Sequence, residues 1–373
     1  MKKSVGIVTM YSPKPNYGNR LQHYAVQTVL EKMGFDTVSY CFEKDDFGTA
    51  KLLRYWLYRL TGYRLTSHRE YWETEISRYL QFRKFNGEYI KTEQIQSTED
   101  IHGKDFYVIG SDQVWNTSWY RYNPMYRHMY LLDFAEPQKR VCFAPSFGIA
   151  QLPEEWKPWF REKLEQFPML SVRENAGAQI IRELTGREAT VVLDPTMLLT
   201  DEEWRTVAQN PKGVKDGYIL TYFLAPKSEE AAECLAKVRG DRPVYELLDP
   251  KNPVVRTAGP SEFLWLFDHA DLVLTDSFHA CVFSLLFNKP FMVFARNDQE
   301  ESMNSRLETL LKKFRLERKY AASGLENDLW EHDYSEGYRV LDRERERTME
   351  FLRKAFGENG YGNEKGFDHL AGF

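Results

Sequence analysis

The sequence predicts an α/β protein built from two domains in series, each with a parallel β-sheet covered by helices on both faces. Short β-branched runs alternate with helical stretches along most of the chain, which is typical of such sheets. The length of 373 residues exceeds the usual size of a single core, so it favours two domains. The predicted strands end in polar residues, and doubly wound sheets bind their ligands at the carboxyl ends of strands.

The first domain is predicted to span residues 1–170. A buried strand at 4–10 is followed by a helix at 20–35, and a second strand follows at 37–41. This order predicts the beginning of a βαβ unit. The segment 48–95 carries aromatic and basic residues at helical spacing, and we interpret it as a helical insertion in this domain. Further strands of the first sheet are predicted at 106–111, 140–146 and 169–173.

The second domain is predicted to span residues 171–333 and to repeat the same alternation. Its predicted strands lie at 190–195, 217–224, 243–247 and 271–275, and its predicted helices at 176–184, 229–238, 261–267, 277–287 and 304–314. The tail at 334–357 predicts a charged amphipathic helix, which we expect to cross back and complete the first domain. Two such domains predict a cleft lined by the carboxyl ends of both sheets.

Charge and composition exclude several classes of partner. Lys and Arg total 50 and Asp and Glu total 55, so the net charge of −5 provides no long-range attraction to nucleic acid. The four cysteines are far apart, and no Cys or His spacing typical of a metal site is present. The first apolar run is too short for a signal peptide, and no segment reaches the roughly 18 apolar residues of a membrane helix. We therefore expect a cytoplasmic protein that binds no metal.

The first candidate site is the motif NYGNRLQ, directly after the first predicted strand. Gly18 allows the backbone to turn tightly, and Asn16 or Asn19 can cap the helix that follows. The exposed N–H groups of this helix terminus favour an anion or a sugar hydroxyl. The alternative is an ordinary capped turn that binds nothing.

The second candidate site is the motif GSDQVWN, where another predicted strand ends. Asp112 lies at the carboxyl end of that strand, the place where doubly wound sheets carry groups that contact a ligand. Trp115 could stack on the face of a sugar. The alternative is an Asx-type turn beside a packed tryptophan.

The third candidate site is the motif SVREN. Arg173 ends a strand, where its guanidinium could bind a carboxylate or a phosphate through two parallel hydrogen bonds. Glu174 suits the first turn of the next helix, close to its positive end. The alternative is a structural Arg–Glu pair.

Two further polar positions carry weaker functional signals. Asp194 precedes Pro195 in VLDPTMLL, so its backbone is kept away from helical angles and its role is predicted to be mainly structural. Arg306 lies early in the leucine-rich helix NSRLETLLKKF. It faces either the region before the helix N-terminus or solvent.

The last candidate is the motif LTDSFHACVFSLLF, where a predicted strand ends at Asp276. Asp276 or Ser277 can cap the following helix, and Phe278 begins the apolar stripe that faces the core. His279 lies off this stripe in the first turn, at the positive end of the helix dipole. We expect the imidazole to be neutral in the free protein and protonated beside a bound phosphate. The alternative is a structural histidine.

Eight motifs, taken together, closely resemble the polysaccharide pyruvyl transferase family over about residues 5–315. They are NYGNRLQ, GSDQVWN, CFAPSFG, SVRE, VLDPTMLL, GPSEFLWLF, LTDSFHACVFSLLFNKPF and NSRLETLL. The resemblance implies two Rossmann-like domains in the arrangement of GT-B glycosyltransferases. It also implies transfer of a pyruvyl group from phosphoenolpyruvate onto a sugar diol as a ketal, with no further cofactor.

The resemblance implies roles for residues that match the family's motifs. Arg173 is implied to contact the anionic groups of the donor, and His279 to act as catalytic acid or phosphate ligand. At the position where the family often has an arginine, two residues before the histidine, this chain has Ser277. Arg306 or Lys289 could supply the missing charge.

The reaction needs a base or a group that orients the sugar hydroxyl as well as an acid, and Asp112 is the candidate. We predict that the remaining candidate positions bind substrate. The predicted substrate-binding residues are Asn16, Asn19, Trp115, Arg173, Glu174, Ser277, Phe278 and Arg306.

The expected function is pyruvyl transfer to a lipid-linked or nucleotide-linked sugar during assembly of a capsule or other surface polysaccharide of the cell envelope. The expected place is the cytoplasm, including the inner face of the membrane. The sequence leaves two alternative functions open. One is a GT-B glycosyltransferase that uses a nucleotide sugar, and the other is a carbohydrate-binding relative without catalysis.

Overall fold

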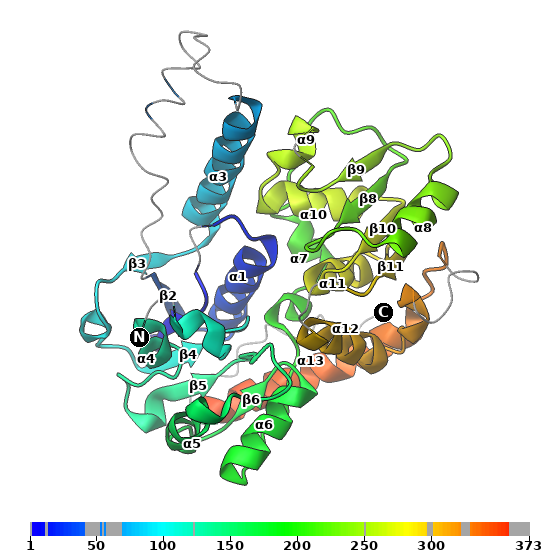
Figure 1. Ribbon diagram of the computed structural model, residues 1–373. Helices are drawn as coiled ribbons and strands as arrows, with labels where there is room; N and C mark the ends of the chain where they lie inside the picture. The colour runs from blue at the N-terminus through cyan, green and yellow to red at the C-terminus, as the bar shows by residue number, and fades with distance from the viewer. Residues whose placement is uncertain are drawn as a thin grey trace.

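A computed structural model describes most of the chain and contains two parallel β-sheets (Figure 1). The described residues are 2–11, 14–41, 53, 56, 69–121, 124–249, 251–296, 301–321 and 329–357. Within the predicted insertion at 48–95, residues 48–52, 54–55 and 57–68 lie outside the described residues, and most of the rest forms helix α3 (Arg69–Tyr89).

The first sheet has five parallel strands in the order β3-β2-β1-β4-β5, which is the strand order of a Rossmann-type sheet. Its strands are β1 (Ser4–Val8), β2 (Asp36–Cys41), β3 (Thr92–Gln94), β4 (Phe106–Ile109) and β5 (Arg140–Cys142). The strands predicted at 4–10, 37–41, 106–111 and 140–146 are present with somewhat different ends, whereas the run 169–173 does not join this sheet. Strand β3 was not predicted because its sequence, TEQ, is polar and exposed.

The second sheet has four parallel strands in the order β11-β10-β8-β9. Its strands are β8 (Ile219–Tyr222), β9 (Val244–Glu246), β10 (Leu272–Thr275) and β11 (Phe291–Val293). Helices α8 (Glu229–Arg239), α10 (Pro260–His269), α11 (Phe278–Leu286) and α12 (Glu301–Lys313) belong to this half. Strand β11 was not predicted, although Asn288, Lys289 and Pro290 separate its short apolar run from that of α11.

Helix α1 (Tyr17–Lys32) joins the two halves through buried aromatic contacts. The Tyr17 ring stacks on Phe263 of α10 with centroids 4.6 Å apart, and its hydroxyl donates to Ala258 O at 2.8 Å. Alternate residues of the first sheet enter two different apolar clusters, and one of these clusters continues into the second sheet. The two domains therefore share one core, which fixes their relative position.

A small parallel pair, β6 (Ser171–Val172) and β7 (Thr190–Val191), lies between the two large sheets in the sequence. Helix α6 (Asn175–Thr185) connects its strands and packs on α5 (Lys157–Glu165). Their apolar residues join the core of the first sheet, not that of the second. The boundary predicted at residue 170 thus falls inside the region that packs on the first sheet.

The C-terminal helix α13 (Ser335–Ala355) crosses from the second domain to the first, as the orange to red ribbon in Figure 1 shows. Near its beginning, Tyr338 Oη donates to Leu285 O of α11 at 2.9 Å. Just beyond its end, the Phe356 ring packs on Phe35 with centroids 4.4 Å apart. The predicted fold class is confirmed: two Rossmann-like domains in a GT-B-type arrangement with a C-terminal helix that crosses back.

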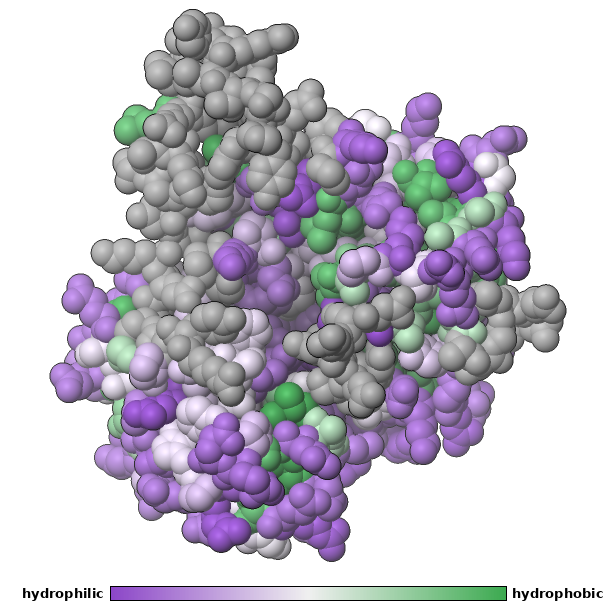
Figure 2. All heavy atoms as spheres, in the orientation of Figure 1, coloured by the Kyte–Doolittle hydropathy of each residue, from purple (hydrophilic) through white to green (hydrophobic). Residues whose placement is uncertain are grey.

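The face of the molecule shown in Figure 2 is mostly hydrophilic, with hydrophobic residues in small separate groups. Such groups are ordinary on a folded protein surface. The described residues form no helix long and apolar enough to cross a membrane.

Candidate active site

The N-termini of α1 and α11 meet at the contact between Gly18 and His279. A β-carbon added to Gly18 would lie 2.8 Å from Cγ of the His279 ring and still closer to Nδ1. Glycine is therefore required for close approach of the histidine, and not for the tight turn that the sequence predicted, because Gly18 has no left-handed φ. Two helix N-termini, one from each domain, face this contact, and both favour negative charge.

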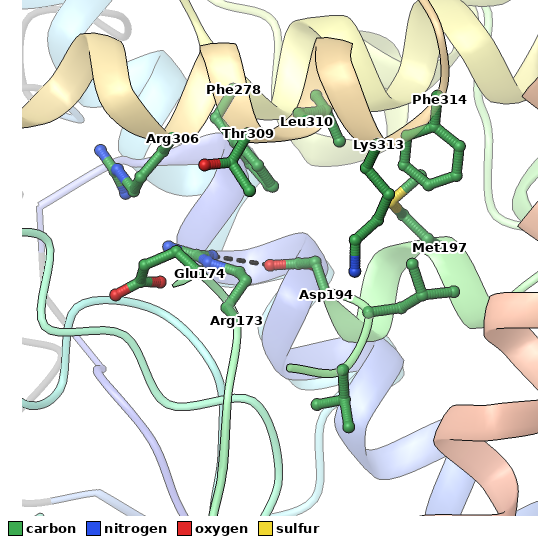
Figure 3. Close-up of a pocket in the computed structure, with 12 residues that line it drawn as sticks. Arg173, Glu174, Asp194, Met197, Phe278, Arg306, Thr309, Leu310, Lys313 and Phe314 are labelled. Atoms are coloured by element: carbon green, nitrogen blue, oxygen red, sulfur yellow. Dashed lines mark hydrogen bonds and ion pairs between the residues drawn. The ribbon is translucent and has the colours of Figure 1, made fainter. Parts of the chain in front are cut away.

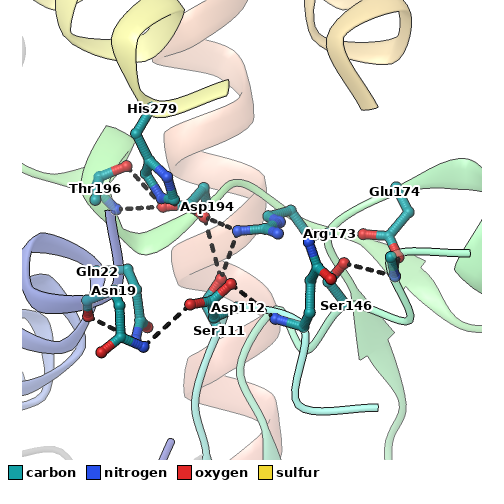
Figure 4. A network of polar contacts seen from close by, with 12 residues as sticks. Asn19, Gln22, Ser111, Asp112, Ser146, Arg173, Glu174, Asp194, Thr196 and His279 are labelled. Carbon is teal, nitrogen blue, oxygen red and sulfur yellow. Dashed lines mark hydrogen bonds and ion pairs between the residues drawn. The ribbon is translucent and has the colours of Figure 1, made fainter. Parts of the chain in front are cut away.

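Asp194 forms the centre of a buried polar cluster beside this contact (Figure 4). Its Oδ2 accepts from Arg173 Nη1 at 2.6 Å and from Ser111 Oγ at 3.1 Å, and lies 3.8 Å from His279 Nε2. Its Oδ1 accepts from the backbone N–H and the hydroxyl of Thr196 at 3.0 and 2.6 Å. The prediction that Asp194 is mainly structural is therefore incomplete, because its carboxylate faces both Arg173 and His279.

Arg173 has buried donor groups without hydrogen-bond partners among the described residues. Its side chain is 3% exposed, and its guanidinium lies over the Phe278 ring at 4.9 Å from the centroid. Within the described part of the chain, neither Nε nor Nη2 of this guanidinium has a hydrogen-bond partner, and the same holds for Nε2 of His279. Buried donors without partners are costly, so an anionic ligand that accepts from them would remove this cost.

Arg173 and Asp194 line a pocket that is closed on its other side by α12 (Figure 3). In this view Lys313 of α12 extends toward Asp194, whereas the Arg306 guanidinium lies above Glu174 and the Thr309 hydroxyl points toward Arg306. The pocket is lined by Arg173, Glu174, Val192, Leu193, Asp194, Met197, Phe278, Arg306, Thr309, Leu310, Lys313 and Phe314. It therefore combines apolar walls with three cationic side chains and two carboxylates, and this excess of cations suits a small anion.

Arg306, and not Lys289, supplies a second guanidinium to the pocket. Burial, with Arg173 nearby, lowers the pKa of Arg306 to about 10. Lys289 lies past the opposite end of α11, where its carbonyl oxygen accepts from Tyr334 Oη at 2.8 Å. Of the two predicted replacements for the arginine absent at Ser277, only Arg306 is in the site.

The charges of the free site follow from burial and from neighbouring groups. Burial lowers the pKa of His279, so the imidazole is neutral near neutral pH. Burial alone would raise the pKa of Asp194, but Arg173 and His279 lower it to about 2. Burial likewise opposes the charge of Arg173, but Asp194 and Asp112 outweigh it and raise the pKa of Arg173. The free site thus holds a carboxylate, a guanidinium and an uncharged imidazole.

Asp112 faces this cluster from the end of β4. It has a left-handed backbone with φ of 77°, which is uncommon for a residue other than glycine and is often found at functional sites. Asn19 Nδ2 donates to Asp112 Oδ2 at 3.1 Å, and the backbone N–H of Gln113 donates to Oδ1 at 2.9 Å. Asn16 is the N-cap of α1, and its side chain accepts from Asn19 N at 3.1 Å. The structure thus brings Asn16, Asn19 and Asp112 together.

Glu174 and Ser277 lie at two helix N-termini of the site. Glu174 is the N-cap residue of α6, and its Oε1 accepts from the backbone N–H groups of Phe147 and Gly148 at 2.9 and 3.5 Å. The structural pair that Arg173 forms is with Asp194 instead of Glu174. Ser277 is the N-cap residue of α11, and its side chain makes no capping hydrogen bond, which leaves the N–H groups of the first turn for a ligand.

The prediction that Trp115 stacks on a sugar is wrong. The Trp115 ring is fully buried and lies 5.2 Å from the Phe147 ring between centroids. Its Nε1 donates to Tyr130 O at 2.8 Å. The alternative interpretation, a packed tryptophan beside a turn, is the correct one.

The model of the family described as polysaccharide pyruvyl transferase matches residues 16–298. The chain belongs to the polysaccharide pyruvyl transferase family. The match covers most of the chain and includes Asp112, Arg173, Asp194 and His279, whereas Arg306 lies just beyond it. The family is one of transferases. No curated protein matches the sequence.

Several solved structures are similar to this family member at low identity. One is a glycosyltransferase from Rickettsia africae, with 11% identity, a TM-score of 0.45, and coverage of 96% of this chain and 100% of that chain. Another is HepE from Anabaena in complex with UDP and glucose, with 11% identity, a TM-score of 0.45, and coverage of 94% and 99%. A third is UDP-GlcNAc 2-epimerase from Neisseria meningitidis bound to UDP-GlcNAc, with 10% identity, a TM-score of 0.41, and coverage of 94% and 100%.

Among the residues that the structure describes, no group of His, Cys, Asp and Glu side chains could hold a metal ion.

Proposed function

We propose that the protein transfers a pyruvyl group from phosphoenolpyruvate to a sugar of a surface-polysaccharide precursor, on which it forms a ketal. The observation that carries the proposal is the buried Arg173 guanidinium, whose Nε and Nη2 have no partner among the described residues. A charged donor in this state favours a ligand with an anionic acceptor. Membership of the polysaccharide pyruvyl transferase family supports phosphoenolpyruvate as that ligand.

Phosphoenolpyruvate carries a phosphate and a carboxylate on one small body, and the pocket offers two guanidinium groups. Arg173 lies at its base and Arg306 on the facing helix α12. The N–H groups at the start of α11 add further donors, since Ser277 does not cap them. In this proposal Arg306 provides the charge that many family members are expected to carry two residues before the histidine.

Ketal formation joins two sugar hydroxyls to C2 of the donor. The methylene carbon takes a proton and becomes a methyl group, and the first hydroxyl oxygen forms a bond to C2. The bond between C2 and the phosphate oxygen then breaks, phosphate leaves with the electron pair, and the second hydroxyl attacks C2. One of the two hydroxyl protons returns to the acid that protonated the methylene carbon. The other leaves with the phosphate.

His279 is the proposed acid of this reaction. It is neutral in the free site because burial lowers its pKa, and a bound anion beside it would raise that pKa and allow protonation. The carboxylate of Asp194, 3.8 Å from Nε2, would stabilise the imidazolium that forms. The pair therefore suits a proton donor that is charged only when the donor substrate is present.

Asp112 is proposed to orient a sugar hydroxyl or accept its proton. Asn19 and the Gln113 backbone N–H each donate to one of its carboxylate oxygens, which fixes the carboxylate at the end of β4. We propose a lipid-linked or nucleotide-linked acceptor, met in the cytoplasm or at the inner face of the membrane. The proposed reaction uses no additional cofactor.

The test is an assay of phosphate release from phosphoenolpyruvate with a panel of acceptors that contain galactose or N-acetylmannosamine. We expect phosphate release that depends on the acceptor, together with a product of the mass of a pyruvyl ketal. The His279→Gln variant should lower turnover about 100-fold or more while it still binds phosphate. Release of UDP from a UDP-sugar, with no phosphate release from phosphoenolpyruvate across the panel, would instead indicate a glycosyltransferase.

A further inference from the structure

The backbone on both sides of Asp194 is hydrogen-bonded to helix α13. On the side before Asp194, the Leu193 N–H donates to Thr348 Oγ1 at 3.1 Å. On the side after it, Arg345 donates through Nε and Nη2 to two carbonyl oxygens in and just after the short helix η5 (Pro195–Leu198), at 2.7 and 3.0 Å. The segment that carries the central carboxylate of the site is therefore held by a helix more than a hundred residues away in sequence.

Thr348 is 1% exposed, and the Arg345 side chain is 15% exposed. A surface helix that only covered a core would not need polar side chains in these buried positions, because each carries a cost unless it is hydrogen-bonded. Here both are bonded to the backbone of one segment. Their hydrogen bonds therefore specify the position of that segment, and not merely the attachment of α13.

The same helix also contacts the two elements that carry His279 and Arg306. Tyr338 Oη donates to Leu285 O of α11, and Glu344 Oε2 lies 3.1 Å from Lys313 Nζ of α12. Helix α13 thus touches the supports of the site histidine, of the second guanidinium and of the central carboxylate. One rigid element can keep these three supports in register.

We propose that Thr348 and Arg345 are positioning residues, which act on the site through the backbone of the Asp194 segment. The inference rests on the proposed function, in which Asp194 orients Arg173 and stabilises protonated His279. A small displacement of the carboxylate changes both interactions, because the attraction between buried charges varies steeply with their separation. The role of α13 is then to set the affinity of the site for an anion and the ionisation of His279.

The test compares Thr348→Val with Thr348→Ser. Valine keeps the shape of threonine but cannot accept the hydrogen bond from Leu193 N–H, whereas serine keeps the hydroxyl. Thermal unfolding of both variants first establishes that each is folded. The two measurements are then the affinity for inorganic phosphate by calorimetry and the titration of His279 by NMR of histidine-labelled protein.

We expect Thr348→Val to bind phosphate about threefold to tenfold more weakly than Thr348→Ser. This is the size of effect expected when one hydrogen bond that holds the Asp194 segment is lost. We also expect the His279 titration to move to lower pH, since Asp194 raises the pKa of His279. The other groups that act on the imidazole are Arg173, Asp112 and Arg306, and neither variant changes them. Equal phosphate affinity and equal titration in the two folded variants would overturn the proposal.

A second pair of variants makes the test independent of any misfolding of Thr348→Val. Arg345→Met removes both hydrogen bonds to the η5 region, and Arg343→Met removes an exposed cation from the same helix. Only the first should weaken phosphate binding. If the wild-type protein neither binds phosphate nor consumes phosphoenolpyruvate, the proposed function fails, but the His279 titration in both pairs still decides whether α13 positions the site.

Discussion

Arg173 donates to Asp194 across 2.6 Å, and the two side chains are 3% and 0% exposed. A buried ion pair adds stability only when its remaining donors and acceptors are satisfied. Asp194 meets this condition through Ser111 and Thr196, whereas Arg173 keeps two nitrogen atoms, Nε and Nη2, without partners in the described part of the chain. The carboxylate is thus satisfied within the protein, whereas the guanidinium retains buried donors that the protein does not satisfy.

The first prediction concerns Asp194→Asn. The change leaves the Arg173 charge buried with a neutral partner, so we expect the free energy of unfolding to fall by about 3–5 kcal/mol. Denaturant unfolding measures this loss. Asp201→Asn is the control, because Asp201 pairs with Arg205 at the surface and should cost less than about 1 kcal/mol. Losses of similar size in the two variants would show that the buried pair has no special role.

The second prediction concerns pH and His279. In an unfolded chain a histidine titrates near about 6.5, but burial lowers the pKa of His279 in the folded protein. The unfolded chain therefore binds more protons as the pH falls, and the folded state loses stability below about pH 6.5. The stability that His279 contributes is complete above that pH. We expect phosphate to reduce this loss, since it raises the pKa of the imidazole.

Thermal unfolding between pH 5 and 7 tests the prediction, with His279→Gln beside the wild type. The variant should lose stability less steeply as the pH falls, and phosphate should change its slope little. The stability of the variant will still depend on pH to some extent, because burial also lowers the pKa of His23 to about 3. Identical slopes for the two proteins, with and without phosphate, would contradict a neutral buried His279.

The third prediction concerns Arg306 as the second guanidinium of the pocket. Arg306→Met keeps the length of the side chain and removes its charge. Loss of a hydrogen bond to a charged group costs about 1.5–3 kcal/mol, so KM for phosphoenolpyruvate should rise about tenfold to a hundredfold. Lys312→Met on the exposed face of the same helix is the matched control. If both variants keep the wild-type KM, Arg306 does not hold the donor.

Much of the fold was predictable, because parallel strands and their helices carry strong periodic signals. The apolar runs of β8 and β10 and the amphipathic pattern of α13 were recognised within a few residues of their ends. Strand β3 was missed because an edge strand buries little and can have a polar sequence. The packing of β6 with the core of the first sheet is a tertiary property that has no local sequence signal.

The site was predictable only where a motif places a polar residue at the end of a strand. This rule identified Asp112, Arg173 and His279, which the structure brings close together. The same rule failed for Trp115, since an indole beside a turn can pack inward or outward with the same sequence. The role of Asp194 was missed because its proline neighbour explained its position, while its three partners come from distant segments. Thr348 has no sequence signal at all, since it is one polar residue in a charged helix.

The last prediction concerns Gly18, where the close approach of the two domains leaves no room for a side chain. Gly18→Ala would force the His279 ring away from its place beside Asp194, because the added carbon overlaps the ring. We expect turnover to fall by about tenfold or more, since a strained contact of this kind costs about 1–3 kcal/mol. Gly87→Ala is the control, because nothing lies within 4 Å of the added carbon and alanine is the better helix former. The measurements are turnover and the NMR titration of His279, which should change only in Gly18→Ala. An unchanged titration in a folded Gly18→Ala protein would mean that the two domains can move apart at this point without disturbing His279. Gly18 would then serve the fold and not the site.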